Sequence, residues 1–501
     1  MDQFVLWALL EAETTSSGSG TDWFTVLIGA SYIAYLLALL SIPSVLMQRR
    51  GRPQAALTWV LLLFLLPYGL GLFFWWAIGR THLERRRRKK RQATRRLSQR
   101  LAKYQRQLPK PRDAEWGLLP IERFPREEAE WILPPTAGNR VQLLVDAAEA
   151  YPAMEQLIRE AKHHLHLLFY IWQADETGRR FRDLLIEKVQ QGVKVRLLYD
   201  AVGGANVRFG FMDPLIEAGA EVEAFMPPRI FRRSLDLNFR NHRKLVIADG
   251  QAAMLGGFNI GDEYCHDWRD TAVVLRGPAL DQLQEVFADD WYFATQRDYT
   301  SPEYFGRWLN NGRAAHTGHD AACGLISSGP QTALNLTHEA FFLAITTAKR
   351  RIYLTTPYFV PDASIMHALR AAMFRGVDVR LLVPYKSDAP LVRLAGRSYY
   401  PDLLRAGVRI FEYEPMILHS KTGVFDDDLS FIGSANMDIR SFKLNFELSC
   451  FLKSREVCQQ MADIFARDVA QSREISLDEE KKNSYFAQLS EAAAHLMSPL
   501  L

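Results

Sequence analysis

The sequence has 501 residues, 48% of them hydrophobic and 12% aromatic, which predicts two or three domains, each with a sizeable core. The net charge is only +4, but residues 80–103 contain twelve Lys or Arg and one acid, which indicates a local contact with an anionic surface rather than global basicity. The four cysteines form no CxxC pair, which excludes a zinc or disulfide framework and predicts buried free thiols in a reducing compartment.

The first eighty residues predict a membrane anchor. Residues 23–47 and 55–78 carry no charged side chain, and each run exceeds the roughly 20 apolar residues that cross a bilayer core. The link "QRRGRPQ" (48–54) is short, so the two spans are expected to form a hairpin with interfacial tryptophans near its ends. A signal peptide followed by a buried helix is the alternative, but the N-terminus lacks basic residues and no small-x-small cleavage pattern follows.

Positive charges on both sides of the second span predict the orientation. Two full spans place the three arginines of the link opposite the twelve basic residues of 80–103, and the larger group favours the cytoplasm. We therefore expect a multi-pass anchor with the C-terminal bulk inside. A re-entrant hairpin is the alternative, because it would keep both groups in the cytoplasm, and the segments contain residues that permit it: Pro43, Pro67, Gly69 and Gly71.

A basic linker, 81–135, follows the anchor. Its run "RRRRKKR" (85–91) lies beside the second predicted span, where each Lys or Arg near an anionic membrane contributes about 1 kcal/mol of binding. A solvated topology signal explains the same charges, and the sequence leaves both interpretations open.

From about residue 136 the chain repeats itself. The matching segments keep their order, and their offset falls from 187 residues at the first pair to 177 at the His-x-Lys pair, as loops of different length would cause. Strand-like runs alternate with helical stretches such as 178–191 and 362–375, which predicts two α/β domains, 136–315 and 316–501, packed about a pseudo-two-fold axis around one site. The pairs include "AKHHLHLLFYIW" and "AKRRIYLTTPYF", "AGAEVEAF" and "AGVRIFEY", and "LGGFN" and "IGSAN".

Each half carries His-x-Lys followed by four residues and Asp, in "HRKLVIAD" (242–249) and "HSKTGVFD" (419–426). Alternate side chains of an extended strand share a face, so His and Lys point the same way. An Asn follows each His by 17 residues, and an acid follows each Asn by 11. The two halves therefore supply two equivalent sets: His242, Lys244, Asp249, Asn259 and Asp270, and His419, Lys421, Asp426, Asn436 and Glu447.

These sets suit phosphodiester chemistry. One imidazole can attack phosphorus and form a phosphohistidine, while the other protonates the leaving alkoxide and then deprotonates the incoming hydroxyl. The lysines and asparagines are expected to hold the non-bridging oxygens, so no metal and no other cofactor is expected. Asp270 and Glu447 are expected to fix the imidazole tautomers. Asp249 and Asp426 complete the catalytic motifs, with a structural role at the strand end as the alternative.

The blocks "HRKLVIAD…GGFN" and "HSKTGVFD…GSAN" resemble the paired HxKxxxxD and GGxN or GSxN motifs of the phospholipase D superfamily. Other segments, spread over almost the whole chain, are similar to bacterial cardiolipin synthases. They are "GRPQAALTWVLLLFLLPYGLGLFFWWAIG" (51–79), "FYIWQ" (169–173), "TTPYFVPD" (355–362), "NMDIRSFKLNFE" (436–447) and "SPLL" (498–501).

The resemblance implies tandem phospholipase D-like domains in the inner membrane of a bacterial cell. It implies phosphatidylglycerol and cardiolipin as substrate and product, and transfer of a phosphatidyl group from one phosphatidylglycerol to another with release of glycerol. His242 is favoured as the nucleophile, and the phosphate is expected to contact both lysines, Asn259 and Asn436. One departure is Ser434, which stands in the second block where the first has glycine, and its hydroxyl is expected to bind phosphate.

Several alternatives stay open at this point. A phospholipase that passes the intermediate to water and a phosphatidylserine synthase would use the same histidines. A nuclease would use the basic block on nucleic acid, but the anchor argues against it, and two complete catalytic sets argue against a lipid-binding scaffold. The loop "FMPPRIFRR" (225–233) is expected at the bilayer surface, with an ordinary basic loop as the alternative, and the tail 485–501 is expected to dock on the membrane or on the protein itself.

Overall fold

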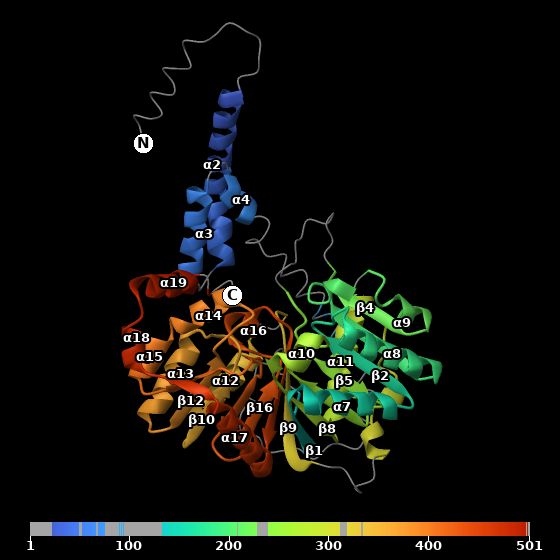
Figure 1. Ribbon diagram of the computed structural model, residues 1–501. Coiled ribbons are helices and arrows are strands. Elements are labelled where there is room, and N and C mark those ends of the chain that lie inside the picture. The colour runs from blue at the N-terminus through green and yellow to red at the C-terminus, as the bar shows by residue number, and fades with distance from the viewer. Residues whose placement is uncertain are drawn as a thin grey trace, which may run out of the picture. The chain divides into compact units, whose positions relative to one another are not determined.

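The computed structural model (Figure 1) divides into a small N-terminal unit and a large α/β unit. Most of the linker 81–135, and all of the loop 225–233 beyond residue 227, lie outside the described residues, so the lipid contacts expected there stay predictions. The structure describes residues 23–49, 53–66, 69–75, 90, 92, 94, 133–207, 209–227, 239–310, 318–331, 334–496 and 498.

The described part of the N-terminal unit has one helix long enough to span a bilayer. Helix α2 (Trp23–Gln48) contains a 20-residue apolar stretch, Gly29–Gln48. The second predicted span is two shorter helices, α3 (Pro53–Leu65) and α4 (Leu70–Phe74), because the chain turns at Gly69, whose φ of 76° is left-handed. A continuous second span and a two-span hairpin are therefore not confirmed.

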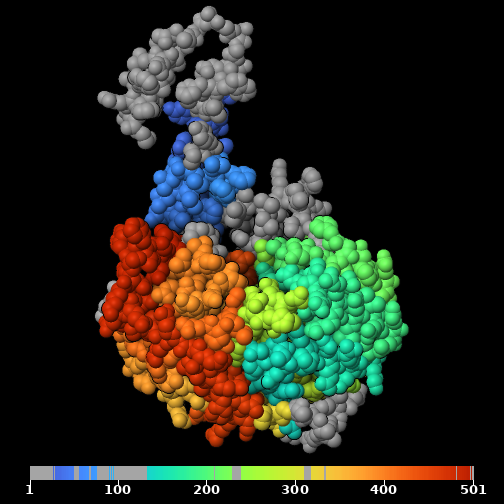
Figure 2. Space-filling view, in the orientation of Figure 1, coloured from blue at the N-terminus to red at the C-terminus, as the bar shows by residue number. Residues whose placement is uncertain are grey.

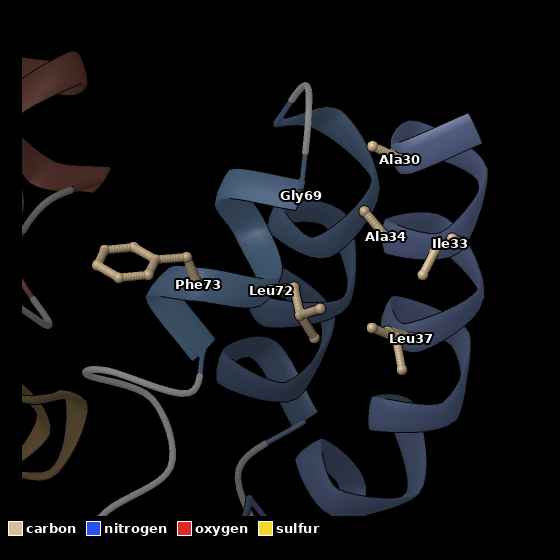
Figure 3. Close-up of a pocket in the computed structure, with 7 residues that line it drawn as sticks. All are labelled: Ala30, Ile33, Ala34, Leu37, Gly69, Leu72 and Phe73. Atoms are coloured by element: carbon tan, nitrogen blue, oxygen red, sulfur yellow. The ribbon is translucent and has the colours of Figure 1, made fainter. Parts of the chain in front are cut away.

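Helix α2 packs against α4 across an apolar groove of about 520 Å³ (Figure 3). A Cβ built on Gly69 would lie 2.8 Å from Cβ of Ala34, so the glycine lets the two segments approach closely. The groove is lined by Ala30, Ile33, Ala34 and Leu37 of α2 and by Gly69, Leu72 and Phe73.

A 15-stranded sheet runs through the α/β unit and repeats the same strand pattern in both directions from its centre. Strands β1 (Thr136–Val145) and β9 (His319–Ser328) pair antiparallel at the centre, and on either side three further antiparallel strands are followed by three strands that are parallel to one another. This arrangement confirms the predicted duplication.

The first half contributes β1 (Thr136–Val145), β2 (His164–Phe169), β3 (Lys194–Asp200), β4 (Glu221–Phe225), β5 (Leu245–Ala248), β6 (Ala252–Gly256) and β8 (Thr271–Arg276). The second contributes β9 (His319–Ser328), β10 (Arg351–Thr355), β12 (Asp378–Pro384), β13 (Arg409–Tyr413), β15 (Thr422–Phe425), β16 (Leu429–Gly433), β18 (Glu447–Lys453) and the extra edge strand β19 (Ser472–Ile475).

Each half has its own hydrophobic core. Helices cover the part of the sheet that belongs to each half (Figure 1). The predicted helix at 178–191 is α8, which buries Phe181, Leu184 and Leu185 and begins where the Asp175 side chain accepts a hydrogen bond from the Gly178 amide. The helices of the first half are α7 (Asp146–Glu160), α8 (Glu176–Gln190), α9 (Asp213–Glu217), α10 (Asp262–His266) and α11 (Ala279–Thr295). Those of the second are α12 (Leu336–Thr347), α13 (Ala363–Phe374), α14 (Pro390–Arg397), α15 (Tyr400–Arg405), α16 (Ile439–Lys443), α17 (Arg455–Val469), α18 (Leu477–Lys481) and α19 (Tyr485–Leu496).

Two short parallel pairings cross between the halves. Strand β14 (Ile417–Leu418) of the second half pairs with β7 (Trp268–Arg269) of the first, and Asn241 forms the equivalent bridge to Phe446. A third short pairing, β11 (Phe359–Val360) with β17 (Met437–Asp438), lies within the second half. The two crossing pairings join the segment that precedes each motif histidine to the segment that precedes the acid of the other half.

Helix α19 shows that the tail docks on the protein itself. Its Glu491 carboxylate accepts a hydrogen bond from Arg397 Nε at 3.1 Å, and Ala494 packs with Val360 and Ala395. Figure 2 shows the helix (red) on the surface of the α/β unit. The opposite helix face leaves Tyr485, Phe486, Leu489 and Leu496 exposed, so a contact of that face with the membrane stays a prediction.

All four cysteines are free thiols, as expected. Cys323, Cys450 and Cys458 are buried, whereas Cys265 is half-buried. Cys323 and Cys450 lie on the neighbouring strands β9 and β18 with their Sγ atoms 3.3 Å apart.

Candidate active site

Each motif histidine is held by the acid of the opposite half. His242 Nδ1 lies 3.1 Å from Oε2 of Glu447, and His419 Nδ1 lies 2.6 Å from Oδ2 of Asp270. The backbone causes this exchange, since the His242 amide donates to the Phe446 carbonyl and the His419 amide donates to the Arg269 carbonyl, each one residue before an acid. The carboxylates select the tautomer protonated at Nδ1, which leaves Nε2 of both rings for the substrate.

Both histidines are buried, and burial favours their neutral form. Burial, followed by the positive charge of Lys244, lowers the pKa of His242 to about 4, and the pKa of His419 is likewise well below its usual value. Burial raises the pKa of Asp270 to about 6. Burial also raises the pKa of Glu447. The interaction with His242 and the charge of Lys244 have a larger, opposite effect, so the pKa of that carboxyl is lowered overall. Burial therefore favours the neutral imidazole, the form that a nitrogen nucleophile requires.

The lysines lie on the same face as the histidines, as the spacing predicts. Lys244 Nζ donates to the His242 carbonyl at 2.7 Å, and Lys421 Nζ donates to the His419 carbonyl. Burial lowers the pKa of both ammonium groups, to about 8 for Lys421. Each ammonium has three donors and uses one on its own motif, so the pair can also donate to phosphate oxygens.

The two asparagines occupy different environments. The Asn259 side chain supports the fold, because its Oδ1 accepts from the Ile171 amide at 3.0 Å and its Nδ2 donates to the Tyr264 hydroxyl at 3.1 Å. Asn436 is buried, and its Oδ1 has no hydrogen-bond partner among the described residues. A buried acceptor without a partner is costly unless a ligand donates to it, so Asn436, unlike Asn259, is open to a donor such as a substrate hydroxyl, whereas an anionic phosphate offers no donor.

Gly257 in the "GGFN" motif and Ser434 in the "GSAN" motif occupy equivalent positions, but they contact the two carboxylates differently. A Cβ built on Gly257 would lie 2.1 Å from Oδ1 of Asp270, so that position must lack a side chain. Its counterpart Ser434 donates its hydroxyl to Oε2 of Glu447 at 2.5 Å and accepts from the Leu448 amide at 2.9 Å. The hydroxyl expected to bind phosphate thus positions Glu447, and its contact with substrate stays a prediction.

The motif aspartates bind backbone instead of a histidine. The Asp249 carboxylate accepts from the amides of Lys162, His163 and His164 at 2.7–2.9 Å, where the chain enters β2. Asp426 makes the equivalent bonds to Lys349 and Arg350, at 2.7–3.0 Å, before β10. Both aspartates have a positive φ, 57° and 53°. These contacts support a structural role for the two aspartates. No contact among the described residues supports a catalytic role for them.

Two aromatic residues beside the histidines are not part of the sequence prediction. The ring of Tyr170 lies 4.8 Å from that of His242, and the ring of Trp268 lies 4.5 Å from that of His419, both edge to face. Tyr170 lies in the "FYIWQ" segment, and that resemblance is the sequence signal for it. For Trp268 the only signal is its place two residues before Asp270.

Behind the His242 motif lies a buried charge network that the motif spacing does not predict. Arg243 and Asn241, on the strand face opposite His242, both bind Asp290 of α11. Arg243 Nε also donates to the Glu447 carbonyl at 3.1 Å, so the network ties His242 and Glu447 together. Among the described residues no group of three or more His, Cys, Asp or Glu is arranged to hold a metal ion.

Comparisons with known proteins agree with this architecture. A family model described as "Cardiolipin synthase, PLD-like domain" matches residues 154–291 and 342–469, one segment in each half. The cardiolipin synthase of Geobacillus thermodenitrificans is 36% identical over 496 residues, covering 95% of this chain and 94% of that protein. The cardiolipin synthase of Alkalihalophilus pseudofirmus is 34% identical over 499 residues, covering 98% and 97%. The major cardiolipin synthase ClsA of Bacillus subtilis is 37% identical over 374 residues, covering 73% and 76%.

A solved structure shares the fold. The phosphatidylserine synthase of Haemophilus influenzae Rd KW20 superposes with a TM-score of 0.56 and covers 72% of this chain and 95% of its own. The sequences are only 15% identical, so this likeness concerns the fold alone. The curated relatives confirm the resemblance drawn from the motifs.

Proposed function

The chain belongs to the cardiolipin synthase family of the phospholipase D superfamily, and from that premise we propose that it transfers a phosphatidyl group from one phosphatidylglycerol to a second. The products are cardiolipin and glycerol. The crosswise histidine–carboxylate pairs carry this proposal, because they orient two imidazoles, as a two-step displacement at phosphorus requires.

In the first step, Nε2 of one histidine bonds to the phosphorus of the donor lipid. The bond between this phosphorus and the oxygen of the headgroup glycerol breaks. The other histidine, as imidazolium, gives its proton to that oxygen, and the anionic phosphate beside it favours the charged ring. The family analogy favours His242 as the nucleophile, with His419 as the acid. Lys244 and Lys421 supply positive charge to the phosphate oxygens as negative charge develops there.

In the second step, a hydroxyl of the second phosphatidylglycerol gives its proton to the now neutral imidazole and attacks phosphorus. The nitrogen–phosphorus bond breaks, cardiolipin leaves, and the first imidazole is free again. No cofactor enters either step. Water in place of the lipid hydroxyl would give phosphatidic acid, so the outcome depends on which acceptor reaches the intermediate.

Helix α2 and the lipid substrate support a proposal for the cellular setting. We place the enzyme in the cell inner membrane, anchored by its N-terminal helices, with the α/β unit at the cytoplasmic face, where the basic residues of 80–103 meet anionic lipid, except Lys90, which is buried against Asp289 and Asp290. Cysteine labelling from either side of sealed vesicles tests this orientation. An Arg405→Cys variant is expected to react only with a reagent that reaches the cytoplasmic side. Reaction only with a reagent on the opposite side would contradict this orientation.

Product analysis by mass spectrometry tests the activity. Purified full-length protein is given phosphatidylglycerol liposomes, and lipids and released glycerol are quantified. Cardiolipin with an equal amount of glycerol is expected. Phosphatidic acid without cardiolipin would overturn the transferase proposal and leave a hydrolase with the same phosphohistidine chemistry.

A further inference from the structure

Lys90, a residue of the basic linker, is buried in the α/β unit. It is only 1% exposed, and its Nζ lies 2.6 Å from Oδ2 of Asp289 and 2.9 Å from Oδ1 of Asp290, both in α11. Residues 90, 92 and 94 have helical backbone, and Thr94, one turn after Lys90, donates its hydroxyl to Oδ1 of Asp289 at 2.6 Å. Gln92, between them, is exposed. The Lys90 charge therefore faces protein rather than a membrane surface.

The carboxylate that binds Lys90 also holds the strand of the His242 motif. Oδ2 of Asp290 accepts a hydrogen bond from Nη1 of Arg243, the residue after His242. Nε of Arg243 donates in turn to the Glu447 carbonyl at 3.1 Å, and the carboxylate of Glu447 orients His242. A continuous chain of ion pairs and hydrogen bonds thus joins Lys90 to the histidine.

The Lys90 ammonium also packs on the residue that pairs with the motif strand. Its Nζ lies 5.9 Å from the ring centroid of Phe446, and the guanidinium of Arg243 lies 5.6 Å from the same centroid. Phe446 directly precedes Glu447, and its carbonyl accepts a hydrogen bond from the His242 amide at 2.9 Å. Lys90 therefore supports the backbone on both sides of the His242–Glu447 pair.

The charge of Lys90 balances two neighbouring carboxylates. Burial raises the pKa of Asp290, but the charges of Arg243 and Lys90 outweigh burial and lower that pKa to about 2, so the carboxyl is ionised. Among the described residues, Lys90 and Arg243 are the cations that contact Asp289 and Asp290. Removal of one partner from a buried ion pair is strongly unfavourable, because the other charge loses its compensation. The position of Arg243 therefore depends on Lys90.

The His419 side has the same kind of support, built from other residues. Nη1 of Arg269 donates to the carbonyl of Asp270 at 2.7 Å, and Nη2 lies 2.8 Å from Oδ2 of Asp468 in α17. Helix α17 follows β18 as α11 follows β8, so an arginine bound to an acid of this helix holds the carbonyl of each orienting acid. This repetition, achieved with arginines from different motif positions, indicates that the support serves the histidines.

The His242 side has one acid more. Asp289 precedes Asp290 in α11, whereas Arg467 precedes Asp468 in α17. Lys90 is the cation that binds this extra acid, at 2.6 Å. The extra acid and the linker residue therefore form one unit, which ties the linker to one of the two histidines.

We propose that Lys90 is a positioning residue for His242. Its ammonium holds Asp290 and Arg243 in place, and Arg243 in turn fixes the Glu447 carbonyl next to the imidazole. The inference rests on the proposed function, in which His242 is one of two reacting histidines. The linker that follows the membrane anchor thereby becomes part of the active site, and catalysis needs Lys90 although its side chain is closed to lipid.

Steady-state rates of the full-length enzyme test the proposal. Lys90→Met removes the charge and keeps an unbranched side chain. On phosphatidylglycerol liposomes it is expected to lower kcat per folded enzyme about ten- to a hundredfold, as misplacement of a reacting group does, with KM and liposome binding within about threefold of wild type. Lys194→Met is the matched control, because it removes an exposed lysine that contacts Glu303 at 3.2 Å, and it is expected to leave kcat unchanged. Wild-type kcat in Lys90→Met, or weaker liposome binding in place of a lower kcat, would overturn the inference.

Two double variants separate positioning from a structural role. In a Glu447→Gln enzyme, which no longer orients the imidazole, Lys90→Met is expected to lower kcat by less than about a further threefold, because both changes act on one histidine. Lys90→Met with Asp289→Asn restores the balance of charges and is expected to return kcat to within about tenfold of wild type, even where Lys90→Met alone does not fold. Fully additive losses in the first variant, or a folded but inactive second variant, would overturn the inference.

Cardiolipin and phosphatidic acid are quantified in every assay. Both products arise from the same histidine chemistry, so Lys90→Met is expected to lower them in equal proportion. A fall in one product alone would overturn the inference, because a misplaced histidine affects every acceptor. A wild-type enzyme that makes phosphatidic acid without cardiolipin would instead overturn the proposed function, and the effect of Lys90→Met on phosphatidic acid would still test the role of Lys90.

Discussion

The carboxylate of Asp270, in the first half of the chain, lies 2.6 Å from Nδ1 of His419, in the second. Glu447 and His242 make the reciprocal pair at 3.1 Å. Neither half therefore contains a histidine oriented by its own acid. This exchange explains why two copies of one motif are kept in a single chain, since each copy completes the other.

Asp270→Asn and Glu447→Gln are expected to reduce the rate of cardiolipin formation about 10²- to 10⁴-fold, because an amide no longer selects the imidazole tautomer protonated at Nδ1. His242→Ala and His419→Ala are expected to abolish turnover. Initial rates measured with phosphatidylglycerol liposomes check both statements. Full activity in either alanine variant would contradict a site shared by the two halves, and full activity in both amide variants would contradict the orienting role of the acids.

Gly257→Ala is expected to lower the rate about ten- to a hundredfold, because the new Cβ would lie 2.1 Å from Oδ1 of Asp270 and push that carboxylate away from His419. Ser434→Ala is the matched change in the other half. It removes one hydrogen bond to Glu447 and leaves the bond to His242, so a loss within about tenfold is expected. Rates per folded enzyme decide the comparison, and an effect of Ser434→Ala larger than that of Gly257→Ala would refute it.

Much of this site can be predicted from the sequence, because a duplicated motif constrains the fold. The matched spacings identify the histidines, lysines and both acids, and the 177-residue offset predicts a sheet built from two similar halves. The crossing of the acids cannot be predicted in this way. It depends on the pairings of β14 with β7 and of Asn241 with Phe446, which join segments that share no sequence signal.

Other differences have local causes. Hydropathy alone predicts a second long span, but the left-handed turn at Gly69 divides that segment. The motif aspartates are invariant between the two halves, which is compatible with catalysis, yet their carboxylates bind backbone amides. A motif position can thus recur because the fold requires it, and spacing does not separate that cause from chemistry.

Asp249→Ala is expected to destabilise the folded protein by about 2–4 kcal/mol, because three backbone amides would lose their acceptor and alanine is strained at a φ of 57°. Asp249→Asn keeps one acceptor oxygen and tolerates positive φ, so a smaller loss is expected. Asp426→Ala and Asp426→Asn provide the same comparison in the second half. Denaturant unfolding in detergent measures the loss, and the rate per folded molecule is expected to stay within about threefold of wild type. Inactive enzyme of unchanged stability would show instead that these aspartates act in catalysis.

The alkaline limb of the pH–rate profile is expected to report Lys421. Burial, opposed by the charge of Asp270, lowers the pKa of its ammonium to about 8, so the group loses its proton as the pH rises through that value, where an ordinary lysine would remain charged. Positive charge beside the phosphate is needed for binding and for the transition state. The ratio kcat/KM, which reports the free enzyme, should therefore fall more steeply above pH 8 than below it, by about a further tenfold per pH unit. Lys421→Arg keeps its charge to pH values above about 12, so its residual activity should show no limb near pH 8. A steepening at the same pH in the arginine variant would assign the titration to another group, and a wild-type profile whose slope does not change between pH 7 and pH 10 would show that Lys421 has an ordinary pKa.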